Sequence, residues 1–263
     1  MHKIIRKFIM WLPIPNGKYF CFFFNLFSII FNSKIKISFK DSFYYIKNLK
    51  WRFHHRKQGA YSYQLGINSR INKLRKNYLI DNIKFNANDV IIDCGANNGD
   101  FSLCFDKNIK YYGIEPSPIV FSNLEYNVKN QKLINKGLWK NSNNIVSFYL
   151  SDEGGDSSII PISNYTKKIN IQTITLDELI DEIDSNVKLI KIEGEGSEPE
   201  ILEGLKKNLK KVQYITIDVG FERGIDQTST YKECENYLLN NNFELINFNK
   251  KKYVLLFKNV SQD

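Results

Sequence analysis

The stretch that decides the fold runs from Val90 to Ser102 and reads VIIDCGANNGDFS. It begins with a short apolar run that ends in an acid, which is typical of a buried parallel strand. Two glycines follow, Gly95 and Gly99, and glycine lets the backbone turn tightly and approach a ligand closely. A strand, a glycine turn and a helix in this order predict one unit of an α/β protein whose ligand lies beyond the strand end.

Strand patterns alternate with helical patterns on both sides of this stretch. Such alternation predicts a doubly wound, Rossmann-like α/β fold, with a mostly parallel sheet between two layers of helices. The last two apolar runs turn at residues 249–252 and predict an antiparallel strand pair at the C-terminus. The expected strands are residues 90–94, 111–115, 132–135, 187–192, 212–219, 243–248 and 253–257, with 145–150 and 169–174 in an insertion. The expected helices are residues 67–83, 99–105, 118–129, 175–183, 198–209 and 230–241.

Two acids flank the glycine turn. Asp93 opens the pattern D-x-G-x-x-x-G, and Glu115 closes the next strand, 20 residues after Gly95. A carboxylate in the position of Glu115 can accept hydrogen bonds from both hydroxyls of a ribose. Asp93 would attract the ammonium group of S-adenosylmethionine and repel a pyrophosphate. The pattern therefore favours S-adenosylmethionine over a nicotinamide dinucleotide, whose signature is G-x-G-x-x-G; a purely structural turn is the third alternative.

A second group of acids follows the strands expected at 187–192 and 212–219. Glu193 lies at a strand tip, Glu195 stands between two glycines, and Asp218 ends the later strand. Methyl transfer to a hydroxyl needs an acceptor for the hydroxyl proton, and a carboxylate can serve. All three histidines lie within the first 60 residues, so we expect the catalytic base to be Glu193, Glu195 or Asp218. As an alternative role, Glu193 and Asp218 are candidate ligands of Mg²⁺.

Together these motifs resemble those of the FkbM-family methyltransferases. The resemblance rests on VIIDCGANNGDFS, on IEPSP at 114–118, on TLDEL at 175–179 and on KIEGEGSE at 191–198, and it covers about residues 85–258. It implies a methyltransferase fold and O-methylation, often of sugars in polysaccharide or natural-product pathways. By the same resemblance, the methionine end of the cofactor is lined by Asp93, Gly95, Asn97 and Gly99, and its ribose is bound by Glu115.

The acidic motif departs from the family pattern. The family usually has Asp-Val or Asp-Ile before its Glu-Gly pair, whereas this chain has Glu193-Gly194 at that point. The carboxylate is kept, on a longer side chain beside a more flexible backbone. We therefore expect an acid with the same role in a different local geometry. Lys191, two residues earlier, is expected to pair with a neighbouring acid.

The charge of the chain is concentrated at its beginning. Residues 1–60 hold 12 basic residues and one acid, Asp41, for a net charge of +11, whereas the rest holds 25 basic and 27 acidic residues, for −2. The same segment holds 15 aromatic residues and a 12-residue apolar run from Phe20 to Phe31. That run is shorter than the roughly 20 residues of a bilayer span. The composition predicts a basic, aromatic-rich helical segment at 1–60 and a methyltransferase domain at 61–263.

Two roles are open for the N-terminal segment. In one, its aromatic side chains pack on the domain as a cap. In the other, they enter the headgroup region of an anionic membrane while lysines and arginines pair with lipid. No nucleic acid is expected as a partner, because the rest of the chain is slightly acidic and lacks Asn/Asp-Pro-Pro-Tyr/Phe after its fourth core strand.

The cysteines argue against a zinc site or a disulfide framework. Cys21, Cys94, Cys104 and Cys234 show neither C-x-x-C spacing nor a neighbouring histidine. A cytoplasmic location fits them, with the cytoplasmic face of the membrane as the alternative. We expect an S-adenosylmethionine-dependent O-methyltransferase that acts on a sugar of a surface polysaccharide, glycolipid or natural product. The rival functions are nucleic-acid methylation and binding without catalysis on the same fold.

Overall fold

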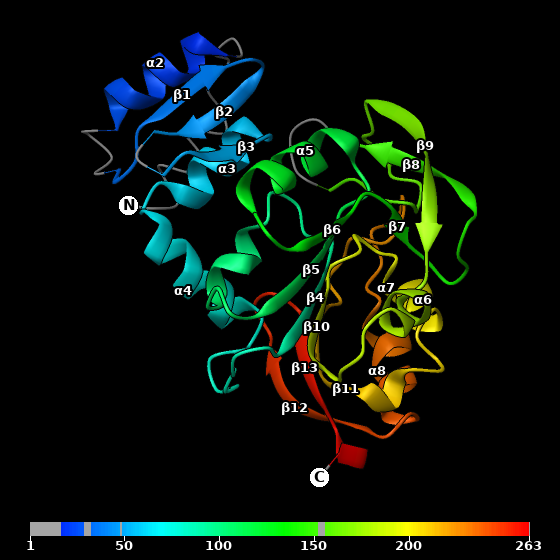
Figure 1. Cartoon of the computed structure of the whole chain (residues 1–263). Coiled ribbons are helices and arrows are strands. Elements are labelled where there is room, and N and C mark those ends of the chain that lie inside the picture. The colour runs from blue at the N-terminus through cyan, green and yellow to red at the C-terminus, as the bar shows by residue number, and fades with distance from the viewer. Residues whose placement is uncertain (1–16, 29–32, 48, 152–155, 263) are drawn as a thin grey trace.

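The structure, a computed structural model, describes residues 17–28, 33–47, 49–151 and 156–262. Seven strands form its central sheet: β4 (Val90–Cys94), β5 (Lys110–Ile114), β6 (Lys132–Ile134), β10 (Val187–Ile192), β11 (Val212–Asp218), β12 (Phe243–Asn249) and β13 (Val254–Asn259). Their order is β12-β13-β11-β10-β4-β5-β6 (Figure 1). Neighbours are parallel, except that β13 runs antiparallel to β11 and β12. The predicted Rossmann-like sheet with an antiparallel C-terminal pair is confirmed.

The strand register brings two charged residues together. Central strand β4 pairs with β10 on one side and β5 on the other, and Asp93 of β4 is the register partner of Lys191 of β10. Register partners on neighbouring strands point to the same face of a sheet, so sheet formation itself places these side chains side by side. The carboxyl ends of β4, β5 and β10 meet at one edge, where α/β sheets bind their ligands.

Helices cover both faces of the sheet. They are α4 (Ile67–Asn77), α5 (Pro118–Asn127), α6 (Leu176–Asp181), α7 (Glu198–Glu203) and α8 (Tyr231–Leu239), with the 3-10 helix η1 (Asp100–Cys104) after β4. One face packs on α6, α7 and α8 through residues such as Leu179 and Leu238. The other packs on α4, η1 and α5 through residues such as Leu74 and Leu124. Two layers of helices thus bury the sheet, as the alternating pattern predicts.

Three helices differ from their predicted form. The helix expected over 67–83 ends at Asn77, because Leu79 adopts a left-handed φ of 60°. The helix expected over 198–209 ends at Glu203. Beyond that point, three successive backbone amides donate to one carboxylate of α6 instead of to a preceding helical turn. The short helix expected after the first strand is the 3-10 helix η1.

The insertion forms a small sheet of its own. Its strands are β7 (Gly137–Leu138), β8 (Ile145–Leu150) and β9 (Lys167–Ile174), in the order β7-β9-β8. Strands β8 and β9 are antiparallel, as their adjacency in sequence favours. Phe148, Ser157 and Ile159 of this insertion line the cavity at the carboxyl edge of the central sheet.

The N-terminal segment is more than the helical extension that the sequence predicted. Its elements are α2 (Lys18–Phe27), β1 (Ile37–Lys40), β2 (Phe43–Ile46), β3 (Trp51–Phe53) and α3 (Arg56–Tyr63). The three strands form an antiparallel sheet on which α2 packs (Figure 1). Buried and half-buried residues alternate along β2 and β3, which is the pattern of a strand with one face on a core. We call residues 17–63 the N-terminal unit; its core includes Phe20, Phe24, Ile37 and Phe53.

The N-terminal unit docks on α5 of the main domain. The side chain of Asn127 pairs with the backbone of Arg52 in both directions, at 2.8 Å each. The Arg52 guanidinium donates to Asn123 Oδ1 at 3.1 Å and lies 4.7 Å from the ring centre of Tyr126. These contacts join the N-terminal unit to the main domain, and the choice between the cap and membrane roles of its aromatic side chains stays a prediction. Among the helices of the described residues, none combines the length and the apolar character that a bilayer span requires.

Candidate active site

A cavity of about 750 Å³ opens at the carboxyl ends of β4, β5 and β10. This volume lies in the usual range of small-molecule sites, roughly 300–1,000 Å³. Most of the site residues expected from the sequence line the cavity: Asp93, Gly95, Asn97, Glu115, Glu193 and Glu195. Gly99 and Asp218 lie outside the lining.

The two positions of the turn require glycine because of different neighbouring residues. Gly95 has a φ of 74°, and a Cβ there would collide with the carbonyl oxygen of Glu193. The turn after β4 therefore runs directly against the turn after β10. Gly99 has a φ of 88°, and a Cβ there would collide with Leu124 and Val128 at the end of α5. Gly99 thus seats α5 against the turn, and its contact with a cofactor stays a prediction.

A buried network of charges lies at the floor of the cavity. Lys191 Nζ lies 3.0 Å from Asp93 Oδ1 and 2.9 Å from Glu193 Oε2. It also donates to the carbonyl oxygens of Cys94 and Gly95, at 3.2 and 2.9 Å. The expected pairing of Lys191 with a neighbouring acid is confirmed, and it joins the first and second acidic motifs in one network.

Asp93 pairs with two side chains of the protein, although its Oδ1 has an ion pair and no hydrogen-bond donor. Burial raises the pKa of Asp93, while Lys191 and the hydroxyl of Tyr111, which donates to Oδ2, oppose that rise. Burial also disfavours the charge of Lys191, but Asp93 and Glu193 outweigh it and raise the pKa of Lys191. The side chain of Asp93 is completely buried, so its main visible role is to position Lys191. Its direct contact with a cofactor ammonium stays a prediction.

Glu193 remains ionised beside this network. Burial alone would raise the pKa of Glu193, but Lys191 and the hydroxyl of Tyr78 outweigh it and hold the pKa below its ordinary value. Tyr78 donates to Glu193 Oε2 at 2.6 Å. The side chain of Glu193 is 32% exposed, so its negative charge faces the cavity. Sequence reasoning missed Tyr78, because its contact with Glu193 joins positions 115 residues apart.

The surroundings of Glu195 shift its pKa in the direction opposite to that of Glu193. Burial, followed by the nearby carboxylates Glu222 and Glu193, raises the pKa of Glu195 well above its ordinary value. The Glu195 carboxylate therefore takes up a proton more readily than an ordinary one. Burial and then Glu193 raise the pKa of Asp218 to about 7. Asp218 accepts from the backbone of Gly220 at 3.0 Å, which engages it with its own loop.

Glu115 stands at the end of β5 on the other side of the glycine turn. Its Oε2 accepts from the amide of Asn97 at 3.0 Å and its Oε1 from the amide of Ser117 at 2.9 Å. Burial raises the pKa of Glu115 to about 7 against the effect of these two amides. Each carboxylate oxygen keeps a second lone pair. Glu115 can therefore also accept hydrogen bonds from two ligand hydroxyls at the cavity wall.

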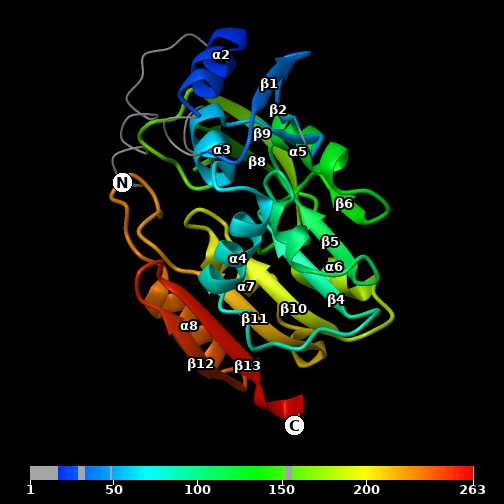
Figure 2. The ribbon, with the colours of Figure 1, turned by 90° about the vertical axis from the view of Figure 1, so that its left-hand side faces the viewer.

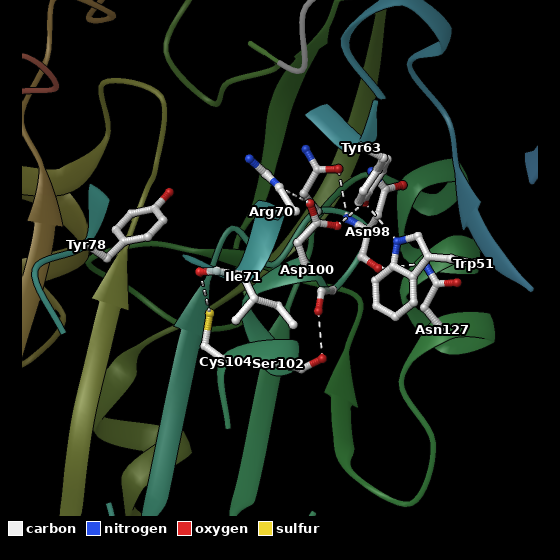
Figure 3. Close-up of polar contacts among 12 residues, drawn as sticks. Trp51, Tyr63, Arg70, Ile71, Tyr78, Asn98, Asp100, Ser102, Cys104 and Asn127 are labelled. Atoms are coloured by element: carbon white, nitrogen blue, oxygen red, sulfur yellow. Dashed lines mark hydrogen bonds and ion pairs between the residues drawn. The ribbon is translucent and has the colours of Figure 1, made fainter. Parts of the chain in front are cut away.

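A hydrogen-bond chain connects the N-terminal unit to the glycine turn (Figure 3). Trp51 Nε1 donates to the hydroxyl of Tyr63 at 2.8 Å, and Tyr63 donates to Asp100. Arg70 of α4 lies 2.7 Å from the other oxygen of Asp100. Sequence reasoning missed these hydrogen bonds. Asp100 directly follows the glycine turn, but nothing in the local sequence pattern indicates a role for Trp51 or Tyr63.

His55 is a further cavity residue that the sequence analysis did not place. The expectation that the site lacks histidine is wrong, because the N-terminal unit folds over the cavity and brings His55 to its lining. The side chain is 5% exposed. A histidine can accept a proton near neutral pH, so the candidates for the base include His55 as well as the carboxylates.

The acids considered for Mg²⁺ have other partners. Glu193 is bound by Lys191 and Tyr78, and Asp218 by Gly220. In the part of the chain that the structure describes, no three or more His, Cys, Asp or Glu side chains form a group that could hold a metal ion.

Comparisons with known proteins agree with the motifs. The model of the family described as methyltransferase FkbM domain matches residues 93–245. The hexuronic acid methyltransferase AglP of Haloferax volcanii is 25% identical over 156 residues, which are 55% of this chain. The chain spans about 60% of the length of that relative.

Solved structures of methyltransferases also resemble the chain. A ribosomal protein L11 methylase from Lactobacillus delbrueckii subsp. bulgaricus covers 72% of this chain and 75% of its own, with 10% identity and a TM-score of 0.40. A TehB-like SAM-dependent methyltransferase from Corynebacterium glutamicum covers 70% of this chain and 86% of its own, with 15% identity and a TM-score of 0.39.

Proposed function

This chain belongs to the FkbM methyltransferase family, and from that membership we propose that it transfers the methyl group of S-adenosylmethionine to a hydroxyl group of a sugar. The sugar would belong to a surface polysaccharide, a glycolipid or a natural product. One observation carries the proposal: Glu115 and the glycine turn at Gly95 meet at the wall of a cavity whose floor holds the ionised Glu193.

The charges of the cavity support S-adenosylmethionine as the cofactor. Glu115 has lone pairs for the two hydroxyls of a ribose, and Glu193 presents a negative charge to the cavity. The cofactor carries two positive groups, an ammonium and a sulfonium, whereas the pyrophosphate of a dinucleotide would be repelled here. When bound, S-adenosylmethionine supplies an electrophilic methyl group.

We assign the acceptor proton to Glu195. A general base works best when its pKa lies near the working pH, and the environment of Glu195 raises its pKa in that direction. Glu195 would hydrogen-bond the acceptor hydroxyl and take its proton as the oxygen is methylated. Glu193, kept ionised by Lys191 and Tyr78, would keep the cavity floor attractive to positive charge.

A sugar acceptor is supported by the name of the relative AglP, which acts on a hexuronic acid. Lys73, Lys251 and Lys252 line the cavity and would attract an acceptor that carries a carboxylate. On the side of the N-terminal unit, His55 and Ser62 add groups that hydrogen-bond hydroxyls.

Calorimetric titration with S-adenosylmethionine tests the cofactor assignment. Wild-type protein should bind it, and Glu115→Ala should bind at least tenfold more weakly, because a lost hydrogen bond to a charged group costs about 1.5–3 kcal/mol. Glu125→Ala, which removes an exposed acid of α5, is the matched control and should bind normally. Wild-type protein that binds NAD in preference to S-adenosylmethionine would contradict the proposal. A transfer assay with EDTA and with added Mg²⁺ tests the metal alternative.

A further inference from the structure

Helix α2 has two apolar faces. One face, with Phe20, Cys21 and Phe24, is buried in the core of the N-terminal unit. The opposite face exposes four large apolar side chains at positions i, i+3, i+4 and i+7, which we call the outer stripe. Its members are Tyr19, Phe22, Phe23 and Leu26, with exposed fractions of 67%, 62%, 36% and 53%. A surface helix of a soluble domain needs one apolar stripe, and among the described residues the outer stripe is not part of the buried core of the N-terminal unit.

The outer stripe lies away from the active site. Figure 1 and Figure 2 both place α2 at the outer end of the molecule, beyond β1 and β2 and far from the central sheet. No residue of the stripe lines the cavity. The stripe is therefore available to a partner while the cavity works on its ligands.

The unit that carries the stripe is strongly basic. Its exposed lysines are Lys18, Lys34, Lys36, Lys40, Lys47 and Lys50. The sole acid of residues 1–60 is Asp41, and it lies 3.8 Å from the ammonium of Lys40. Four aromatic or aliphatic side chains on a unit with six exposed lysines match the chemistry of an anionic bilayer surface, where rings and leucines enter the headgroup region and lysines meet lipid phosphates.

We propose that the outer stripe of α2 docks the protein on an anionic lipid bilayer. A second copy of the chain fits less well, because two N-terminal units, each with a net charge of +8, would repel each other. A stripe of four residues is also small beside the roughly 800 Å² per partner of a stable interface. Nucleic acid would use the lysines but would have no need of the apolar stripe. The packing of α2 in the core of the N-terminal unit and the membrane contact then belong to opposite faces of one helix. This inference does not rest on the proposed methyl transfer.

Co-sedimentation of the full chain with lipid vesicles tests the docking. The vesicles contain phosphatidylcholine alone or phosphatidylcholine mixed with phosphatidylglycerol. We expect binding to the mixed vesicles, and a partition coefficient at least tenfold lower for the double variant Phe22→Ser, Leu26→Ser. The matched control is Ile145→Ser, Ile225→Ser, which removes two side chains that are 76% and 66% exposed outside the N-terminal unit. The control should bind like the wild type.

Charge is tested in the same assay. Lys34→Gln, Lys36→Gln should weaken binding to the mixed vesicles, whereas Lys167→Gln, Lys168→Gln, at the exposed start of β9, should not. Thermal unfolding of each variant shows that it is folded. The proposal is overturned if both kinds of vesicle sediment while the wild-type protein stays in the supernatant. Equal binding of wild type and of the double variant Phe22→Ser, Leu26→Ser also overturns it. A third contrary result is a wild-type dimer in ultracentrifugation that the double variant does not form, combined with no binding to vesicles.

Discussion

The ammonium of Lys191 lies 3.0 Å from Oδ1 of Asp93, and the two side chains are 3% and 0% exposed. They are register partners on β10 and β4, so each is buried next to the other as soon as the strands pair. Removing one partner of a buried ion pair leaves a charge without compensation in the interior. The fold of the site edge therefore depends on both residues.

Replacing Lys191 by Met should lower the free energy of unfolding by roughly 3–5 kcal/mol. The reason is the buried carboxylate of Asp93, which loses its ammonium partner. Urea unfolding at neutral pH measures the loss. Asp93→Asn in the Lys191→Met background should recover part of it.

The control for this prediction is Lys207→Met. Lys207 pairs with Asp181 at 2.8 Å, but the side chains are 70% and 43% exposed, and exposed pairs contribute about 0–1 kcal/mol. Equal losses in Lys191→Met and Lys207→Met would show that the buried network adds no stability.

Glu195→Gln should lower kcat about 100-fold or more while S-adenosylmethionine binds as in the wild type, because the amide keeps the shape but cannot take a proton. Only the ionised carboxylate is active, so wild-type kcat should increase with pH through the raised pKa of Glu195, above the range of an ordinary glutamate. Steady-state kinetics across pH measures both effects. If His55→Gln lowers kcat and Glu195→Gln does not, the base is His55.

The free energy of unfolding should decrease as the pH rises through the neutral range. Burial and then Asp218 raise the pKa of Glu222 from 4.5 to about 9. Between these values the folded protein holds a proton that the unfolded chain releases, so the stability present below the lower pKa is lost as pH approaches the higher one. The slope is about 1.4 kcal/mol per proton and pH unit. Urea unfolding at several pH values should show that the free energy of unfolding changes less with pH in Glu222→Gln than in the wild type. An unchanged pH dependence would show that Glu222 is not the group that causes it.

Deleting residues 1–60 should give a chain that aggregates. The deletion removes the hydrogen bonds between Arg52 and Asn127 and uncovers Ile67 and Leu103, which pack against the core of the N-terminal unit. Exposed apolar surface of this kind favours association. Light scattering and thermal unfolding measure the effect, and Asn127→Ala should give a milder loss of about 1–2 kcal/mol. A monomeric, stable chain from residue 61 would instead make residues 61–263 an independent domain.

The central sheet was predictable because buried parallel strands are local apolar runs. The strands over 90–94 and 187–192 have the bounds that their sequences predict. The start of α6 was equally local: Thr175 accepts from the amide of Glu178 at 3.1 Å, as the Thr-x-x-Glu pattern predicts. Helix ends were less predictable, because the chain leaves α4 through the positive φ of Leu79, which an apolar pattern does not reveal.

The residues of the candidate site also fall into two groups, those that local sequence patterns predict and those that depend on the tertiary fold. Glu115 and Glu193 were found because each directly follows an expected strand, and the rule for α/β sheets places strand ends together. Tyr78, Tyr63 and His55 reach the site from segments before the first core strand. Their places depend on how the N-terminal unit and α4 fold over the cavity, which local sequence patterns do not encode.

Transfer of a labelled methyl group is the most direct measurement of the proposed O-methylation. The purified chain of 263 residues is incubated with S-adenosylmethionine that carries a deuterated methyl group and with cell-surface glycans from cells that lack the protein. The products are analysed by mass spectrometry. We expect a deuterated methyl group on an oxygen of a sugar, formed by the wild type and strongly reduced with Glu195→Gln. Label that appears on nucleic acid, or on no glycan although the cofactor binds, would contradict it.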